Sequence, residues 1–162
     1  MNRVKKNYSD PVRLFLSSVA EARIEARRLR LRIQRLETQA TKLTASLTGM
    51  PRGGGDRESL LASLADTRVK CDQALVEAER QEDAVTAFIN RLDNPVSRIL
   101  LKLRYCDCLD WVGRSKRTVI KEMAKAGLFY SERQIRRLHG IALNEARELY
   151  KKEYGDDESR DS

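Results

Sequence analysis

The fold is decided by a long stretch in which apolar or small residues recur at alternating intervals of three and four, VRLFLSSVAEARIEARRLRLRIQRLETQATKLTASL (residues 12–47). The repeat positions are Val12, Phe15, Val19, Ala22, Ala26, Leu29, Ile33, Leu36, Ala40, Leu43 and Leu47. This heptad spacing predicts a long helix of the coiled-coil type, with one side packed against a partner helix. Asp10 and Pro11 precede the repeat, and an aspartate followed by a proline is a typical helix start.

A second stretch with the same spacing follows, and a segment rich in glycine separates the two. Its repeat positions are Leu60, Leu64, Thr67, Cys71, Ala74, Ala78, Gln81, Val85, Phe88 and Leu92, with Thr67 and Gln81 as polar exceptions. The separating segment, TGMPRGGGD (residues 48–56), contains a proline and three consecutive glycines, which do not continue a helix cheaply. We therefore expect an all-α chain in which residues 11–93 form a long antiparallel helical hairpin, preceded by an N-terminal arm at residues 1–10.

Two pairs of apolar residues in the predicted hairpin fall outside the heptad positions. Ile24 and Leu31 are seven residues apart in the first helix, and Val69 and Val76 are seven apart in the second. Scattered exposed apolar residues are common on protein surfaces. A lone long hairpin has little core, however, so we expect these four residues to support self-association, with a homodimer as the favoured state.

Composition and charge restrict the classes of function. The formal net charge is +8, with basic segments at residues 1–47 and 95–150 on either side of an acidic one, which favours an acidic partner such as nucleic acid. The chain has no apolar run long enough to span a membrane and no secretion-signal pattern at its start, so we expect a cytoplasmic protein, in a bacterial host cell, without a membrane partner.

The chemistry-bearing residues are too few for an enzyme or a metal site. The cysteines Cys71, Cys106 and Cys108 are odd in number and are expected to be reduced thiols, and His139 is the only histidine. The glycines at 53–55 lack the Lys-Ser/Thr of a phosphate-binding loop, and no paired carboxylates mark an acid–base site. We therefore expect a protein that is not an enzyme and has neither a cofactor nor a bound metal.

The C-terminal third has the element order of a helix-turn-helix domain, which we assign to residues 94–150. Asn94 and Pro95 open a helix at 95–105, whose predicted inward residues are Val96, Ile99, Leu100 and Leu103. A polar loop around Gly113 leads to a short helix at 119–127 that ends at Gly127. The tail at residues 151–162 is polar, and we expect it to be disordered.

The last predicted helix carries the candidate DNA contacts. Ser131 and Gln134 have the spacing of a capping box, a pair that stabilises a helix start. With Ile135 facing inward, Arg133, Arg137 and Gly140 point outward, and Gln134 and Arg136 lie on the flanks. Arginine and glutamine are the side chains that pair with guanine and adenine edges through two hydrogen bonds. The alternative interpretation is a solvated arginine face.

The preceding loop adds a second basic group, formed by Arg114, Lys116 and Arg117, which suits contacts to phosphates. By contrast, His139 falls on the inward side of the last helix and is expected to be a packed or boundary residue. Trp111 is expected to anchor the core.

Two stretches, LKLRYCDCLDW (residues 101–111) and YSERQIRRLHGIAL (residues 130–143), resemble the fourth conserved region of bacterial sigma factors. Together with SLTGMPRGGG (residues 46–55), they more closely resemble phage regulators of late transcription of the RinA- or ArpU-like family, over about residues 30–150. The segment between Trp111 and Ser131 is longer here than in that family and includes the basic stretch GRSKRTVIK.

The resemblance implies a transcriptional regulator that binds double-stranded DNA, with RNA polymerase as a second candidate partner. It implies that Ser131 caps the recognition helix and that Arg133, Gln134, Arg136 and Arg137 contact DNA. Two alternatives remain open. One is a DNA-packaging recognition subunit of the small-terminase type, and the other is a coiled-coil adaptor that binds protein.

Overall fold

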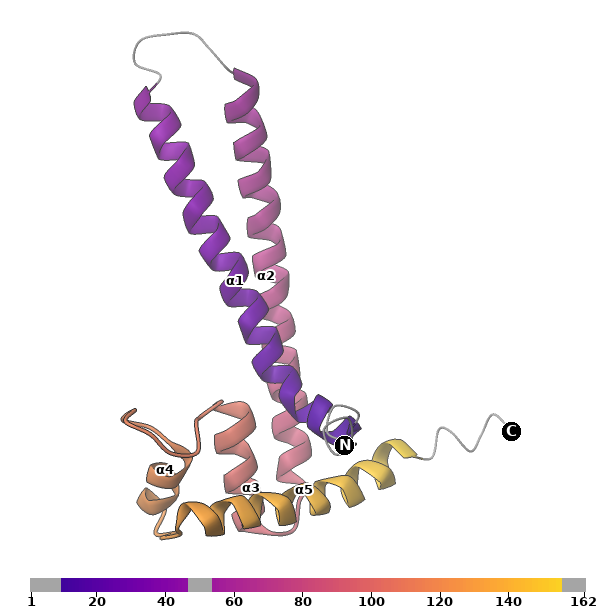
Figure 1. Cartoon of the computed structure of the whole chain (residues 1–162). Helices are drawn as coiled ribbons and strands as arrows, with labels where there is room; N and C mark the ends of the chain where they lie inside the picture. The colour runs from indigo at the N-terminus through magenta and orange to yellow at the C-terminus, as the bar shows by residue number, and fades with distance from the viewer. Residues whose placement is uncertain (1–9, 47–53, 156–162) are drawn as a thin grey trace, which may run out of the picture. The chain divides into compact units, whose positions relative to one another are not determined.

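In the computed structural model, which describes residues 10–46 and 54–155, the chain is all-α (Figure 1). The two long helices are α1 (Pro11–Ser46) and α2 (Gly54–Asn90). The shorter elements are α3 (Pro95–Leu101), the π-helical turn η1 (Lys102–Cys106), α4 (Val119–Lys125) and α5 (Glu132–Tyr154). Helices α1 and α2 form a long antiparallel hairpin, and the shorter helices pack together. The predicted fold class is therefore confirmed.

Some predicted boundaries differ from the observed ones. Helix α2 begins at Gly54, so residues 54–56 of the expected glycine-rich loop are helical, and residues 47–53 lie outside the described part. Helix α5 extends through Tyr154, so residues 151–154 of the expected disordered tail are helical as well. The remainder of that tail and the arm at residues 1–9 are also outside the described residues.

The chain divides into two compact units, and the division cuts across both long helices. One unit is residues 21–80, and the other contains residues 1–20 and 81–162. The division does not follow the expected boundary at residue 94. The base of the hairpin shares one hydrophobic cluster with α3, η1, α4 and α5, since Leu16 and Phe88 are buried together with Leu100, Met123 and Leu143.

In the unit at residues 21–80, a narrow seam of small side chains joins α1 to α2. Ala26 and Leu29 of α1 are buried, as are Leu64, Cys71 and Ala78 of α2, which confirms the heptad positions. The carbonyl of Ala26 accepts a long hydrogen bond from the Cys71 thiol at 3.9 Å. Seam positions are thus filled by alanine, cysteine and leucine.

The polar exceptions of the second heptad repeat are both hydrogen-bonded. The buried Thr67 hydroxyl donates to the Ser63 carbonyl one turn earlier, at 2.7 Å. Gln81, in the other unit, accepts a hydrogen bond from the Ser18 hydroxyl at 3.0 Å. A buried polar group is costly only when it has no partner, so neither exception disrupts the hairpin.

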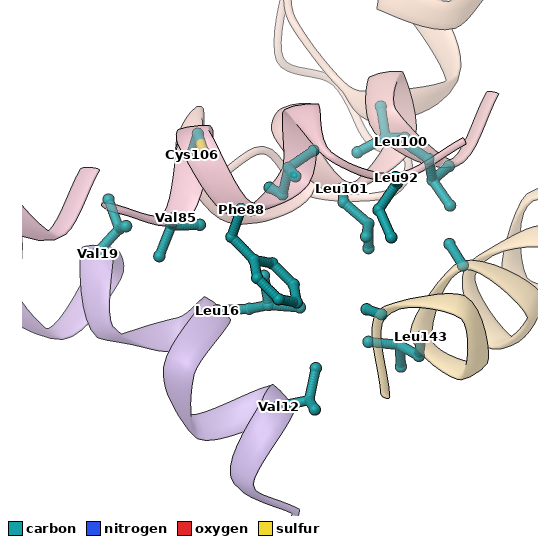
Figure 2. Packing of buried hydrophobic residues seen from close by; sticks show 14 of the residues in the cluster. Val12, Leu16, Val19, Val85, Phe88, Leu92, Leu100, Leu101, Cys106 and Leu143 are labelled. Carbon is teal, nitrogen blue, oxygen red and sulfur yellow. The ribbon is translucent and has the colours of Figure 1, made fainter. Parts of the chain in front are cut away.

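The core of the unit that contains the C-terminal helices is built around the base of the hairpin (Figure 2). The rings of Phe15 and Phe88 meet edge to face at 5.2 Å, and Tyr150 of α5 lies 5.9 Å from Phe15. Helix α5 thereby covers a further side of α1, and Leu16, which is off the heptad pattern, becomes fully buried. Full burial of one such side chain stabilises the fold by about 1.5–3 kcal/mol.

Helix α3 starts as predicted, and its buried side is wider than predicted. The Asn94 side chain accepts a hydrogen bond from the Val96 amide at 3.0 Å, and Pro95 occupies the first turn. The buried residues of α3 are Ser97, Leu100 and Leu101. Of the predicted inward residues, Leu100 is fully buried, and Val96, Ile99 and Leu103 are only partly buried against the core. All four predicted inward residues therefore contact the core, and Ser97 and Leu101 are buried in addition, because α3 packs against several elements.

No helix within residues 10–46 and 54–155 has the length and apolar character needed to cross a membrane.

Candidate nucleic-acid interface

A glycine turn after α4 and a capping box position the start of α5. Gly127, at a φ of +81°, follows the end of α4, and the Leu128 amide donates to the Met123 carbonyl at 2.9 Å, which closes that helix. At the start of α5, the Ser131 hydroxyl accepts from the Gln134 amide at 3.2 Å. The Gln134 carboxamide oxygen in turn accepts from the Ser131 amide at 2.8 Å. The predicted capping box is confirmed, and it makes the first turn of α5 well defined.

Helix α5 has distinct inward and outward sides. Ile135, Ala142 and Leu143 are buried, whereas Arg133 and Arg137 are exposed. Gly140 is exposed on the same side as the two arginines, and a Cβ added there would meet nothing within 4 Å. Among residues 10–46 and 54–155, neither guanidinium takes part in an ion pair or side-chain hydrogen bond. The predicted orientation is confirmed, and both arginines are available to an external acceptor.

The two flanking residues are already engaged within α5. Arg136 pairs with Glu132 one turn earlier at 2.8 Å. Gln134 uses its carboxamide oxygen in the capping box. A glutamine that reads adenine needs both its oxygen and its nitrogen, so Gln134 would have to leave the cap to do so. The outward arginines are therefore the stronger candidates for base contacts.

The loop before α4 offers a second basic group. Arg114 and Lys116 are exposed on this loop, which runs from Asp107 to Thr118. Arg117 differs from them, because its guanidinium pairs with Asp107 at 3.2 Å and with Glu122 at 3.4 Å. Arg117 therefore holds the loop to α4, and a phosphate would compete with these two carboxylates for it.

Backbone contacts hold the same loop in shape. The Lys121 ammonium donates to the Gly113 carbonyl at 3.1 Å and to the Ser115 carbonyl at 2.6 Å. Gly113 adopts a φ of +143°, which disfavours residues that have a side chain. The buried Thr118 hydroxyl accepts from the Lys121 amide at 3.4 Å and caps α4. The basic loop thus has a definite path into α4.

Behind the outward arginines, an aromatic cluster supports α5. The Tyr105 hydroxyl shares a hydrogen bond with His139 Nε2 at 2.9 Å, and the Trp111 ring meets the imidazole edge to face at 4.7 Å. The Arg104 guanidinium lies over the Trp111 ring at 4.9 Å. These contacts link α5 to η1 and to the basic loop, so Trp111 packs against the core as expected.

The imidazole of His139 is a neutral packing group. The pKa of His139 is lowered from 6.5 to about 4, first by burial and then by the nearby charges of Arg13, Arg104 and Arg147. Burial also raises the pKa of the Tyr105 hydroxyl. The expectation that His139 is a packed boundary residue is confirmed.

One long-range ion pair was not foreseeable from the sequence. Asp10 caps α1 by accepting from the Val12 amide at 3.2 Å, as predicted, and it also accepts from Arg147 of α5 at 2.8 Å. Burial by itself would raise the pKa of Asp10, but the hydrogen bond and charge of Arg147 outweigh it and lower the pKa. The two residues are 137 positions apart, and no local pattern signals their contact.

Sequence reasoning also left Phe129 without a role. The Phe129 ring is 80% exposed. It lies two residues before the Ser131 cap, in the segment between α4 and α5. An aromatic residue between two predicted helices was the only signal in the sequence, and phenylalanine is one of the residues that contacts thymine methyl groups.

No known protein family, curated protein or solved structure matches the chain. Within the described residues, no group of three or more histidine, cysteine, aspartate or glutamate side chains is placed to hold a metal ion.

Proposed function

We propose that the protein is a sequence-specific regulator of transcription that binds double-stranded DNA through α5 and the loop before α4. The supporting observation is the outward side of α5, where Arg133 and Arg137 are exposed and have no partner in the described residues. Exposed arginines near the start of a capped helix are suited to the major groove, which admits one helix.

The two basic groups would have different tasks. Arg133 and Arg137 would read base edges, because a guanidinium matches the two acceptors of guanine. Arg114 and Lys116 would bind phosphates, which adds affinity without sequence preference and makes binding sensitive to salt. Arg117 would keep the loop in place through Asp107 and Glu122.

The resemblance of residues 30–150 to RinA- or ArpU-like regulators supports a phage or prophage origin and control of late genes. It also makes RNA polymerase a second candidate partner, because sigma-like modules contact that enzyme. A packaging subunit of the small-terminase type would use the same DNA-binding surface. The two functions differ in where on the genome the protein binds.

The test is selection of fragments from the protein's own phage or prophage genome, at two salt concentrations and with excess competitor DNA. Enrichment of a few fragments upstream of late genes supports the regulator. Enrichment at a packaging site supports the terminase-like alternative. Absence of enrichment at both salt concentrations would refute DNA recognition and favour a protein-binding adaptor.

A matched pair of variants makes the selection specific. Arg137→Ala should reduce the enrichment, whereas Lys152→Ala, in the last turn of the same helix, should preserve it. Both variants remove one exposed positive charge from α5, so a difference in enrichment between them must arise from where on α5 the charge lies and not from the change in net charge.

A further inference from the structure

Among the described residues of the hairpin unit at residues 21–80, six large apolar side chains are exposed; four of them form two pairs seven residues apart, and the other two are Leu61 and Leu75. Ile24 is 68% exposed and Leu31 is 46% exposed on α1, and Val69 and Val76 are 55% and 65% exposed on α2. These are the residues that the sequence placed outside the heptad seam. Their exposure confirms that the hairpin itself leaves them uncovered.

The two pairs lie on opposite sides of the hairpin. At about 3.6 residues per turn, Ile24 and Leu31 point away from the seam residue Ala26, because positions two or five residues apart are roughly half a turn out of phase. Val69 and Val76 are related in the same way to the seam residue Cys71. Since each seam faces the other helix, the two outer faces point in opposite directions.

The outer faces carry opposite charge. The outer face of α1, defined here by Ile24, Arg27, Leu31 and Arg35, is basic and apolar. The outer face of α2, defined by Val69, Asp72 and Val76, is acidic and apolar. Within the described residues, Arg27, Arg35 and Asp72 have neither an ion pair nor a side-chain hydrogen bond. Each outer face therefore carries unpaired charge, and the opposite charge is present on the other outer face.

The antiparallel alignment of α1 with α2 also places similar residues of the two outer faces at the same level along the hairpin. The bond from Cys71 to Ala26 and the ion pair from Arg68 to Glu37 set the antiparallel alignment of α1 with α2. Continued along both helices, this alignment brings Ile24 about level with Val76, and Leu31 about level with Val69.

The same alignment brings Arg27 about level with Asp72. A second hairpin placed alongside in the same direction, without an axial shift, would therefore set apolar residues against apolar ones and arginine against aspartate.

We propose that the hairpins associate side by side and in the same direction, with the outer face of α1 in one copy against the outer face of α2 in the next. Contact between two α1 faces would bring arginines together, and contact between two α2 faces would bring aspartates together, so charge favours the mixed pairing. A pair formed this way leaves one face of each kind uncovered. Such interfaces continue until a ring closes, so we expect an assembly larger than the dimer expected from the sequence.

The proposal depends only on residues 21–80 and not on DNA binding, so it is tested without DNA. The mass of the full-length protein is measured by light scattering and native mass spectrometry across a range of concentrations. The wild type should form a species of more than two 18.6 kDa chains. Arg27→Glu and Asp72→Arg should each weaken association about tenfold or more, because each places like charges opposite one another.

Mixing the two variants provides the decisive measurement. In an alternating assembly, the glutamate introduced at position 27 contacts the arginine introduced at position 72 of the neighbouring copy. The next interface joins the native Arg27 of the second variant to the native Asp72 of the first, so the mixture should again form a species of more than two chains. Arg30→Glu is the matched control, because Arg30 is exposed on the seam side of α1 and the change in charge is the same. Its mass should equal that of the wild type.

Three outcomes would overturn the proposal. One is a wild type that stays monomeric at every concentration, which would leave the faces to a different protein. Another is loss of association in Arg27→Glu but not in Asp72→Arg, which would indicate contact between two α1 faces. The third is failure of the mixture to reassociate. Circular dichroism of each variant checks that the helices are intact.

Discussion

His139 should make the stability of the protein depend on pH between neutrality and weak acid. The folded state lowers the pKa of the imidazole from 6.5 to about 4, first through burial and then through the charges of Arg13, Arg104 and Arg147. As the pH falls below 6.5, His139 therefore binds a proton in the unfolded chain but not in the folded chain. The contribution of His139 to stability is complete above pH 6.5 and is lost progressively towards pH 4.

The size of the effect follows from the pKa shift. At full strength, a shift from 6.5 to about 4 corresponds to about 3 kcal/mol between the two limits. His139 is only partly buried, so solvent screens the neighbouring arginine charges and lessens the effect. Between pH 7 and pH 5 we expect the free energy of unfolding to fall by about 1–2 kcal/mol.

The measurement is urea denaturation, followed by circular dichroism, at a series of pH values from 7 to 5. His139 is the only histidine in the chain, so no other imidazole contributes in this range. The control is His139→Gln, which keeps a polar side chain of similar length near Tyr105 but has no group that titrates here. This variant should be less stable at pH 7 and nearly independent of pH over the same range.

Two results would contradict the reasoning. A wild type whose free energy of unfolding is constant from pH 7 to pH 5 would show that burial does not depress the His139 pKa. An equal decrease in His139→Gln would assign the pH dependence to other groups. Direct titration of the imidazole by nuclear magnetic resonance adds a check, because its midpoint should lie well below 6.5.

The remaining predictions concern the proposed DNA-binding surface. Arg133→Ala and Arg137→Ala should each reduce discrimination against mismatched sites by about 1–3 kcal/mol, measured as the ratio of specific to random-DNA affinity. Arg114→Ala should weaken binding to all sequences alike and lower the slope of log affinity against log salt by about 1; an effect confined to one sequence would contradict its assignment to phosphate. Ser131→Ala should lower the free energy of unfolding by about 0.5–2 kcal/mol through loss of the capping box, and unchanged stability would show that the cap contributes little.

The state of assembly bears on the choice between the proposed regulator and the packaging alternative. Regulators of the helix-turn-helix type usually bind as dimers, so that two recognition helices meet two half-sites. Packaging subunits form large closed rings. A ring built from the outer faces of α1 and α2 would therefore add weight to the packaging alternative, and a compact dimer would add weight to regulation.

Local sequence patterns were sufficient to predict much of the candidate interface. The Ser131–Gln134 capping box, the stop at Gly127 and the outward side of α5 all depend on residues within a turn or two of each other. Such contacts form whenever the segment is helical, whatever surrounds it. The sequence could not reveal that Arg117 is bound by Asp107 and Glu122, because the loop brings those partners together in space.

Heptad periodicity was sufficient to predict the two long helices, their antiparallel pairing and the positions of the seam, because it depends only on the spacing of apolar residues along one helix. The set of elements that share a core follows instead from how the helices pack together. Leu16 and Leu101 became fully buried, and Asp10 met Arg147, because several helices converge on the base of the hairpin. Burial of that kind depends on surfaces contributed by residues far apart in the chain, and no periodicity within one helix encodes it.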